Sequence, residues 1–483
     1  MNNFLSIFDN NQHSDDDLMF PRVSFELTEN LTPVAGHVAT SYRGCLLVFA
    51  GYFCSENQLG YREPEFLYVY PYALAGNFNV WLKIKCTSKV PLKPNCGASA
   101  LIHGDSLFIF GGTTTVPENI ARSRSFSAST LYKLDLKTGV WQFVDIPLDK
   151  KLPTPRDKSA SWIIGNKLYF FGGYGARLSR LEHTDSYLFD ADDFKEGNDA
   201  GRNVWNNQLL EFDVVKSEWN LVPKSGCVPT QRAAPGAAYV QDLHSVFLFG
   251  GRDEACRLND LYRLDNFSMH WSKLEVEGEK PSGRSWSTFT LLPKQRVILM
   301  QGGFSNEDQP LDDAWHLDLS DFYDLQKCRD GTATVRWICI RPPTAPPEPN
   351  NEESNESEED VNPYRRFWHT ANLMSEAVLV YGGMNQNPTI SGPCLNSLHI
   401  QQHQPTTLFK ICLRSLQRNH LHELPSIFST FNLKRKLNLL EEMHRFKNRK
   451  SSSSYLTDST RHCPSLFELS LSEIFDVLDL KVN

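Results

Sequence analysis

The fold is decided by a short apolar phrase, which in its fourth copy reads Ser245-Val-Phe-Leu-Phe-Gly-Gly251. A search for internal repeats finds this phrase six times, each time as an apolar run that ends in a pair of small residues. The other copies are Cys45–Gly51, Ser106–Gly112, Lys167–Gly173, Arg296–Gly303 and Ala377–Gly383. Only the first copy replaces one glycine, with Ala50. Six matches in register indicate a single repeat architecture.

Strand-like segments surround each copy of the phrase. The segment before it ends in a Gly, Asp or Asn turn, which predicts a hairpin. Most copies are followed by a Leu-Tyr-x-Leu-Asp type strand and a tryptophan, as in Leu131–Asp135 before Trp141 and Leu261–Asp265 before Trp271. Four strands, a glycine pair that allows a tight backbone turn at the end of a strand, and an aromatic residue between neighbouring sheets are typical of a propeller blade. The pattern resembles the kelch repeat and predicts an all-β, six-bladed kelch β-propeller with a C-terminal helical tail.

Several segments fall outside the repeats. The acidic run Glu352–Asp360, within residues 342–363, cannot bury a core and predicts a solvated loop in the fifth repeat. The composition changes near Pro405, where a helical pattern with basic polar positions begins. We therefore divide the chain into a flexible N-terminus (1–19), the propeller (20–405), a helical region (406–450), a serine-rich linker (451–464) and an amphipathic C-terminal segment (465–483) whose role the sequence leaves open.

Closure of the ring needs a further strand, because the sixth repeat runs out of chain near Pro405 before its outer strand. We expect Arg22-Val-Ser-Phe-Glu-Leu27 to supply it, so that strands from both ends of the chain share one blade. Without this strand the blade would present an unpaired edge, which invites aggregation.

The composition argues against several classes of function. The formal net charge of −8 disfavours a general nucleic-acid binder, which would be basic overall. Residues 1–20 contain no continuous apolar stretch and no later segment has the length of a membrane span. We therefore expect no membrane partner and a cytoplasmic or nuclear protein. The 11 cysteines form no Cys-x-x-Cys pair, so neither a metal site nor a disulfide framework is indicated, and we expect no cofactor.

A binding site is predicted where the blades meet one rim. In a four-stranded blade the start of the first strand and the loop between the second and third strands share a rim, so unusual residues at these two places converge. The residues after the six glycine pairs are Tyr52, Thr113, Tyr174, Arg252, Phe304 and Met384. The fourth repeat therefore places a guanidinium at this rim.

Three consecutive repeats supply the inferred constellation of Tyr174, Trp205, Arg252, Arg257, Ser285 and Trp286. Guanidinium forks pair bidentately with carboxylates, and a recessed wall strengthens that pairing, so a carboxylate is the expected ligand. Two plainer interpretations remain open: rim arginines are often only solvated, and Trp286 could be a core residue. We exclude Arg232, Arg284 and Arg366 from the site, because each follows a Pro-x-x-Arg phrase and is interpreted as a structural residue of the repeat.

These motifs resemble those of a known receptor family. Gly-Gly-Tyr174, Trp205-Asn206, Gly-Gly-Arg252 with Arg257-Leu-Asn-Asp260, and Gly283-Arg-Ser-Trp286 are similar to the pocket motifs of the kelch domain-containing protein 2 family. Those receptors capture the C-terminal end of other proteins, commonly one that finishes in glycine. The resemblance implies that Arg252, Arg257 and Ser285 hold the terminal carboxylate, that Tyr174, Trp205 and Trp286 form the walls, and that Lys158 contributes a rim contact.

The tail carries a second resemblance. Leu408, Cys412 and Leu416 are spaced four residues apart and line one side of a predicted helix, which must be buried against something. Packing on its own propeller is one interpretation. The phrase Thr-Leu-x-x-x-Cys-x-x-x-Leu resembles an elongin-binding box, and the downstream Leu424-Pro425 resembles a cullin-2 box. The resemblance implies that elongins B and C, cullin-2 and its RING subunit are partners.

We consider three alternative functions for this sequence. The first is a substrate-recognition subunit of a cullin-2 RING ubiquitin ligase, which is not itself an enzyme. The alternative is a kelch scaffold that binds a partner without any ligase, which predicts no elongin in a pull-down. The third is a copper-radical oxidase on the same type of propeller, but its tyrosine, histidine and cross-linked cysteine ligands have no evident counterpart here.

Overall fold

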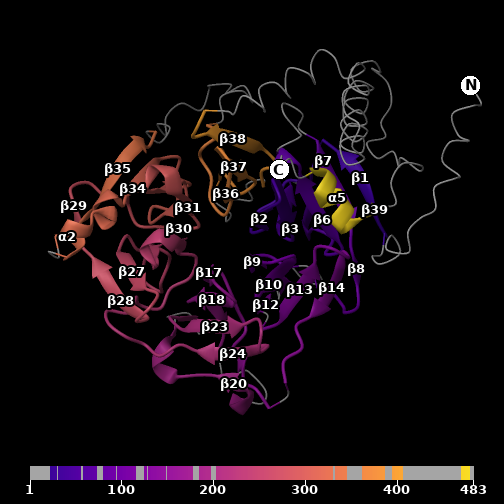
Figure 1. The fold of residues 1–483 in the computed structure, drawn as a ribbon, viewed down its shortest axis with the longest axis horizontal. Coiled ribbons are helices and arrows are strands. Elements are labelled where there is room, and N and C mark those ends of the chain that lie inside the picture. Colours follow the sequence, from indigo (N-terminus) through magenta and orange to yellow (C-terminus); the bar gives the residue numbers. More distant parts are fainter. Residues whose placement is uncertain are drawn as a thin grey trace, which may run out of the picture.

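A computed structural model of the chain describes residues 22–29, 31–55, 58–72, 80–93, 95–115, 125–127, 129–147, 149–177, 184–196, 203–329, 332–344, 362–386, 394–405 and 469–478. The described part is mainly β-strand and forms a series of small, mostly antiparallel sheets (Figure 1). The expectation of a mainly β, kelch-type repeat domain is confirmed. The predicted helical region, linker and acidic loop lie outside the described residues.

Each glycine-pair phrase forms the second strand of a sheet, as the repeat predicts. The first three sheets are β2 (Val38–Tyr42), β3 (Cys45–Phe49), β6 (Phe66–Tyr70) and β7 (Trp81–Lys85); β9 (Ser99–His103), β10 (Ser106–Phe110), β13 (Leu131–Asp135) and β14 (Val140–Phe143); and β17 (Ala160–Ile164), β18 (Lys167–Phe171), β23 (Leu209–Asp213) and β24 (Glu218–Leu221). The remaining sheets are β25 (Gly236–Val240), β26 (Ser245–Phe249), β27 (Leu261–Asp265) and β28 (His270–Leu274); β31 (Thr288–Leu292), β32 (Val297–Gln301), β34 (Ala314–Asp318) and β35 (Val335–Arg341); and β36 (Thr370–Met374), β37 (Ala377–Tyr381) and β38 (Leu398–Gln402).

Shorter strands either add to these sheets or pair with one another near the ends of the sheets. Two of them pair in parallel with an outer strand: β8 (Thr87–Ser88) with β14, and β29 (Val276–Glu277) with β35. The others include β4 (Tyr52–Ser55), β5 (Gln58–Tyr61), β11 (Thr113–Thr115), β12 (Ser125–Ser127), β15 (Leu152–Pro153), β16 (Arg156–Asp157), β19 (Tyr174–Ala176), β20 (Tyr187–Leu188), β21 (Phe194–Glu196), β22 (Asn203–Asn206), β30 (Arg284–Ser285) and β33 (Phe304–Ser305).

The innermost strands of the sheets pack against one another in the cyclic order β2, β9, β17, β25, β31 and β36, around the centre seen in Figure 1. Backbone hydrogen bonds of 2.7–3.2 Å follow the same circle, because one amide in each repeat donates to the carbonyl of the equivalent residue in the repeat before it. These six residues are Gly36, Gly97, Lys158, Ala234, Trp286 and Trp368, and we call them the inner ring. The sheets therefore form a closed, propeller-type domain.

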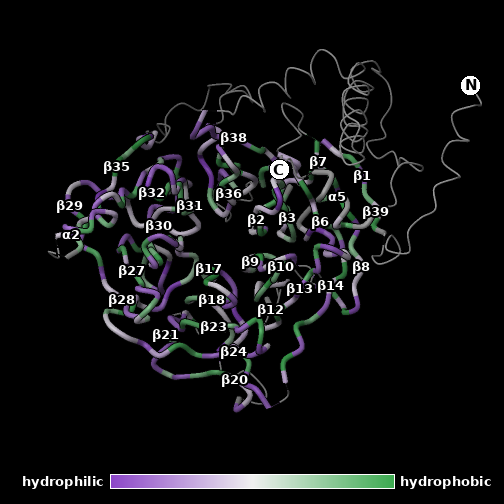
Figure 2. The backbone as a smooth tube through the Cα atoms, in the orientation of Figure 1, coloured by the Kyte–Doolittle hydropathy of each residue, from purple (hydrophilic) through white to green (hydrophobic). Residues whose placement is uncertain are grey.

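Aromatic side chains fill the spaces between sheets, as the repeat predicts. In five repeats a tryptophan from the outer strand packs on the aromatic residue that precedes the glycine pair of the preceding repeat, with ring centroids 4.7–5.1 Å apart. The pairs are Trp81–Tyr381, Trp141–Phe49, Trp219–Phe110, Trp271–Phe171 and Trp337–Phe249. Figure 2 shows that hydrophobic residues recur in every sheet, which fits a core divided among the gaps.

The Pro-x-x-Arg arginines are structural. Arg232 pairs with Asp260 at 2.6 and 3.0 Å, and Arg284 pairs with Asp313 at 2.6 and 2.8 Å, each within its own repeat. Arg366 donates to the Gly382 carbonyl at 3.1 Å. All three side chains are buried, so their exclusion from the site agrees with the structure. Bidentate, buried pairs of this kind hold a loop in one orientation.

The predicted closure strand lies elsewhere. β1 (Arg22–Thr28) pairs antiparallel with β7, so it is the fifth strand of the first sheet and not the outer strand of the sixth. The apolar side chains of Phe25 and Leu27 pack on the core between the first and second repeats, which explains this placement. The first and sixth repeats meet through backbone hydrogen bonds, from Gly36 to the Trp368 carbonyl at 3.2 Å and from Gly383 to the Val34 carbonyl at 2.8 Å, and through side chains. Trp81 packs on Tyr381, and Arg62 donates to the Tyr381 hydroxyl at 2.9 Å.

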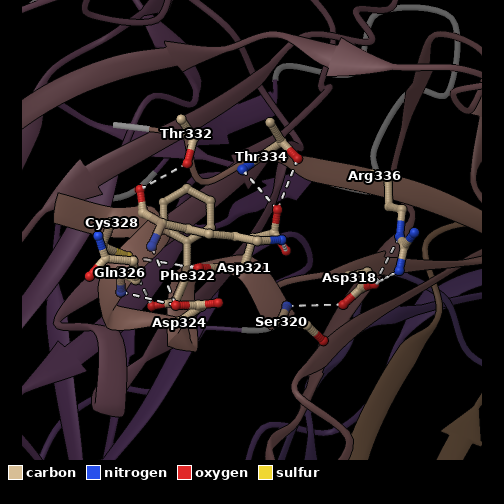
Figure 3. Close-up of polar contacts among 11 residues, drawn as sticks. Asp318, Ser320, Asp321, Phe322, Asp324, Gln326, Cys328, Thr332, Thr334 and Arg336 are labelled. Atoms are coloured by element: carbon tan, nitrogen blue, oxygen red, sulfur yellow. Dashed lines mark hydrogen bonds and ion pairs between the residues drawn. The ribbon is translucent and has the colours of Figure 1, made fainter. Parts of the chain in front are cut away.

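The connection from β34 to β35 folds into a polar cluster on the fifth sheet (Figure 3). It contains a short helix, α2 (Leu325–Arg329). The Asp321 carboxylate accepts from Lys327 at 2.6 Å and from the Thr334 hydroxyl at 3.1 Å. Asp318 and Arg336 join the two strands at 2.8 Å. The side chains in this insertion therefore satisfy one another.

Candidate functional site

The residue after each glycine pair forms an antiparallel bridge with the residue just before the inner ring. The six bridges are Ala35–Tyr52, Cys96–Thr113, Asp157–Tyr174, Ala233–Arg252, Ser285–Phe304 and Phe367–Met384. The two places that the sequence expected to converge are thus hydrogen-bonded neighbours in every repeat. All the predicted rim residues in the described part belong to this layer or to the loops beside it.

Arg252 and Arg257 face each other across one tight turn. Their backbones form an antiparallel bridge, and the Asp253 carboxylate holds the turn by accepting from the amides of Ala255 and Cys256 at 2.8 Å each. The Arg252 side chain is exposed and makes no hydrogen bond or ion pair with any residue that the structure describes. It is therefore available to a ligand.

Arg257 is held more firmly than its neighbour. It is only 8% exposed, and its guanidinium lies 4.6 Å from the centre of the Phe304 ring. Its amide donates to the Asn306 side chain at 2.7 Å, and it forms an ion pair with Asp308 at 3.1 Å. Burial and the nearby Arg252 charge lower the pKa of Arg257, against the opposing effect of Asp308. An anion beside both arginines would relieve this like-charge repulsion.

Ser285 places a buried hydroxyl next to this pair. The residue is 1% exposed, and its backbone pairs with Phe304, the ring under the Arg257 guanidinium. Its Oγ has no hydrogen-bond partner among the described residues. A polar ligand at this position would supply the hydroxyl with a partner.

Tyr174 and Trp205 form an aromatic pair in the third repeat. They are cross-strand neighbours in β19 and β22, with ring centroids 4.7 Å apart. Trp205 also pairs with Lys195, whose ammonium lies 3.8 Å from the Glu254 carboxylate in the arginine turn. The aromatic pair therefore lies on a hairpin that reaches the turn carrying Arg252 and Arg257.

Lys158, for which the resemblance implies a rim contact, already has a partner in the structure. It belongs to the inner ring, and its ammonium pairs with the adjacent Asp157 at 2.6 Å. Burial disfavours its charge, but the Asp157 carboxylate outweighs this effect and raises the pKa of Lys158. Its ammonium also lies 5.5 Å from the centre of the Trp368 ring. A ligand would have to share this lysine with Asp157.

Trp286 and Trp368 stack on one another in the inner ring, with centroids 5.2 Å apart. Both have a left-handed backbone, with φ of 57° and 56°, which costs an L-residue roughly 1–2 kcal/mol. The other four inner-ring residues have the same left-handed backbone, so this conformation belongs to the repeat. The indole nitrogen of Trp286 is buried and has no partner among the described residues.

The sequence interpretation missed Trp368, although the signal was present. Arg366-Phe-Trp368 repeats the phrase Arg284-Ser-Trp286 in the next repeat. The Trp368 indole extends over the first repeat, since a Cβ added to Gly36 would lie 2.9 Å from its ring. It also contacts Tyr52, with centroids 5.4 Å apart. Trp368 therefore covers part of the middle of the inner ring and forms a floor beside Trp286.

Other predicted features are not described or not found. The tail residues Leu408, Cys412, Leu416, Leu424 and Pro425 lie outside the described residues. Within the described ranges, His, Cys, Asp and Glu side chains nowhere gather in a group of three or more suited to a metal ion. Among the helices in the described ranges, none has the length and apolar character needed to cross a membrane.

The repeated phrase, the propeller-type sheets and the rim layer together define a kelch-repeat domain. The family model described as the KLHDC2/KLHL20/DRC7 kelch-repeats domain matches residues 36–196 and 194–355, and the chain belongs to this family. Kelch domain-containing protein 1 of Mus musculus is 30% identical over 398 residues, covering 80% of this chain and 84% of the relative. Kelch domain-containing protein 2 of Homo sapiens is 30% identical over 431 residues, covering 85% of this chain and 93% of the relative. Kelch-repeat domains are typically non-catalytic binding modules.

Proposed function

We propose that this chain is a binding subunit that captures the free C-terminal carboxylate of other proteins at the rim formed by its third to fifth repeats. The observation that carries the proposal is the exposed Arg252 beside the buried Arg257, together with the buried Ser285 hydroxyl; within the described residues, neither the Arg252 side chain nor this hydroxyl has a hydrogen-bond partner. Two guanidiniums and one hydroxyl supply donors for both oxygens of a carboxylate.

The aromatic residues favour a ligand that is thin near its charged end. Tyr174 and Trp205 stand on one side of the arginine turn, and Trp286 follows directly after Ser285. A terminal glycine has no side chain, so its carboxylate can reach the arginines between these rings. A bulky last residue would meet the rings instead. We therefore propose glycine-ended C-termini as the substrate class.

The sequence of the tail extends the proposal to a ubiquitin ligase. The elongin-box phrase of Leu408, Cys412 and Leu416 and the cullin-2 phrase at Leu424-Pro425 support a substrate receptor that joins elongins B and C and cullin-2 with its RING subunit. Such a receptor would work in the cytoplasm or nucleus on a propeller of six blades and would have no catalytic residue of its own.

Calorimetric titration with a glycine-ended peptide and its C-terminal amide tests the capture of a carboxylate. Amidation removes the charge and leaves the guanidiniums poorly paired. Hydrogen bonds to charged groups contribute roughly 1.5–3 kcal/mol each, so the amide should bind at least about tenfold more weakly. Arg252→Ala should weaken binding of the free-acid peptide by a similar factor. Arg336 is an exposed arginine on β35, and Arg336→Ala should leave that affinity unchanged.

Equal affinity of the unaltered protein for the acid and the amide would contradict the mechanism. A loss of affinity in Arg336→Ala as large as that in Arg252→Ala would show that only overall charge matters. Binding of the acid at the rim without elongin in a pull-down would support the simpler scaffold function.

A further inference from the structure

The C-terminal segment returns to the propeller and docks on its first two repeats. β39 (Leu469–Ser470) pairs antiparallel with the beginning of β1, at Val23 and Arg22. The helix α5 (Leu471–Leu478) follows at once and lies beside β1 and β39 in Figure 1. The Ser472 amide donates to the Lys137 carbonyl at 3.1 Å. The segment is therefore held by a strand, a backbone contact and a helix.

One face of α5 is buried in the core between the first and second repeats. Leu471, Ile474 and Phe475 have the i, i+3, i+4 spacing of a helical stripe, and each is at most 2% exposed. The Phe475 ring meets Tyr42 edge to face, with centroids 4.8 Å apart. These three side chains belong to the same core cluster as Val23.

The surface under α5 is shaped for close approach. Gly139, in the turn between β13 and β14, has φ of 71°, and a Cβ there would lie 2.8 Å from Val23 and 3.7 Å from Leu471. Only glycine combines this backbone conformation with that spacing. The same turn supplies the Lys137 carbonyl that Ser472 contacts.

Both ends of segment 406–468 are anchored on the propeller. At the far end, α5 contacts Tyr42 at the end of β2 and the turn between β13 and β14, whereas β39 pairs with the start of β1, which lies at the glycine-pair end of the first sheet. At the near end, the chain leaves the sixth repeat opposite to its glycine pair. There the His403 amide donates to the Glu376 carbonyl at 2.9 Å, in the turn between β36 and β37.

We infer that β39 and α5 form an intramolecular clasp, which covers the edge of β1 and fastens the far end of segment 406–468 to the outer edge of the first two repeats. The occupant of the docking surface is this chain's own C-terminal segment. An uncovered β1 would present unpaired backbone groups at the edge of the first sheet, and the strand addition removes that edge at its beginning. The tail is thus attached to the propeller at two places, in the sixth and the first repeats.

The full-length chain with a site-specific protease sequence inserted at residues 451–454 tests the clasp. After cleavage, the fragment that contains α5 should co-elute with the propeller in gel filtration at micromolar protein. Phe475→Ser should release it and speed hydrogen exchange at the start of β1 at least tenfold. Phe267→Ser, the same change at a side chain that is 76% exposed, should do neither.

Separation of the fragment from the otherwise unaltered chain would overturn the inference. So would a fragment that stays bound in Phe475→Ser with unchanged exchange in β1. Co-elution of the uncut chain as a concentration-dependent dimer that Phe475→Ser abolishes would mean docking between two copies, which also contradicts an intramolecular clasp. Neither readout involves a carboxylate peptide or elongin, so the result is independent of the proposed function.

Discussion

The candidate site combines groups that are costly to the unliganded protein. Arg252 and Arg257 carry like charges across one turn, Ser285 buries a hydroxyl without a partner in the described structure, and Trp286 has a strained backbone. The like charges of the arginines lower stability and are relieved when an anionic group enters between them, and the same group would give the hydroxyl a partner. The backbone conformation of Trp286 is shared by the inner ring, where Lys158 and Ala234 have φ of 57° and 53°.

Ser285→Ala separates binding from stability. Removing a buried hydroxyl that has no partner should leave the melting temperature unchanged or raise it, because the cost of desolvating that group, about 1–3 kcal/mol, disappears. The same change should weaken binding of a glycine-ended peptide roughly tenfold, since a hydrogen bond to the carboxylate is lost. Thermal unfolding and calorimetry measure the two effects. A large fall in melting temperature would instead indicate a structural role for this hydroxyl.

Trp368→Gly tests whether the floor of the inner ring contacts the ligand. The substitution relieves backbone strain of about 1–2 kcal/mol, but it removes a ring stack worth about 0.5–1.5 kcal/mol and the apolar contacts of the indole with Gly36 and Tyr52, so the melting temperature should fall moderately. Peptide binding should weaken about fivefold, as expected for the loss of about 1 kcal/mol of contact. Ala234→Gly, at the equivalent inner-ring position without a ring, is the control and should bind normally. Unchanged binding in Trp368→Gly would remove Trp368 from the site.

At the scale of secondary-structure elements, the strands differ in whether their pairing partners can be predicted from the sequence. The glycine-pair strands were predicted from the sequence because an apolar run and its turn are local. The pairing partner of β1 was not predicted, because this strand can add to any open sheet edge. The burial of Phe25 and Leu27 between the first two repeats decides which edge it joins. The pairing of β39 depends in turn on the position of β1.

One prediction concerns the helix that the sequence predicts around Leu408, Cys412 and Leu416. Replacing Leu408 and Cys412 with aspartate would place charges on the stripe that resembles an elongin-binding box, so co-purification of elongins B and C should be lost. The propeller should remain folded, as judged by its melting temperature and by unchanged peptide binding. Gln417 and Arg418 lie next to Leu416 but outside the spacing of four, and their double aspartate variant is the control. Elongin bound equally to both variants would contradict the assignment.

For the molecule as a whole, the closed ring buries a histidine on each side of the sixth repeat. His37 lies where the first and sixth repeats meet, with its ring 2.9 Å from the Thr370 hydroxyl, and His369 lies against Gly302 of the fifth repeat. Burial, with a smaller effect from Arg62, lowers the pKa of His37 to about 3. Burial also holds the pKa of His369 well below its usual value, helped by Arg366. Both rings are therefore neutral in the folded protein.

Acidification should weaken the contacts of the sixth repeat with both of its neighbours. Below pH 6.5 the unfolded histidines bind protons that the folded ones do not, so stability present above pH 6.5 is lost as the pH falls toward 3. The loss approaches about 1.4 kcal/mol per pH unit for each histidine. The melting temperature should drop between pH 7.5 and 5.5, and less steeply in His37→Gln. The exposed His270→Gln serves as the control. Identical pH profiles for all three proteins would exclude this explanation.

The sequence by itself determined the repeat, its strands, the aromatic residues between sheets and the convergence of the arginine turn with Ser285. These follow from local periodicity and from a register that the glycine pairs impose on every copy. Only the tertiary structure decided that Lys158 is paired with Asp157, that Trp368 reaches over Gly36, that β1 joins the first sheet and that α5 docks at Gly139. Each of these contacts joins side chains or edges far apart in the chain, and several partners would have satisfied the same pattern. The choice among them is made by the shape of the closed ring, which no single segment contains.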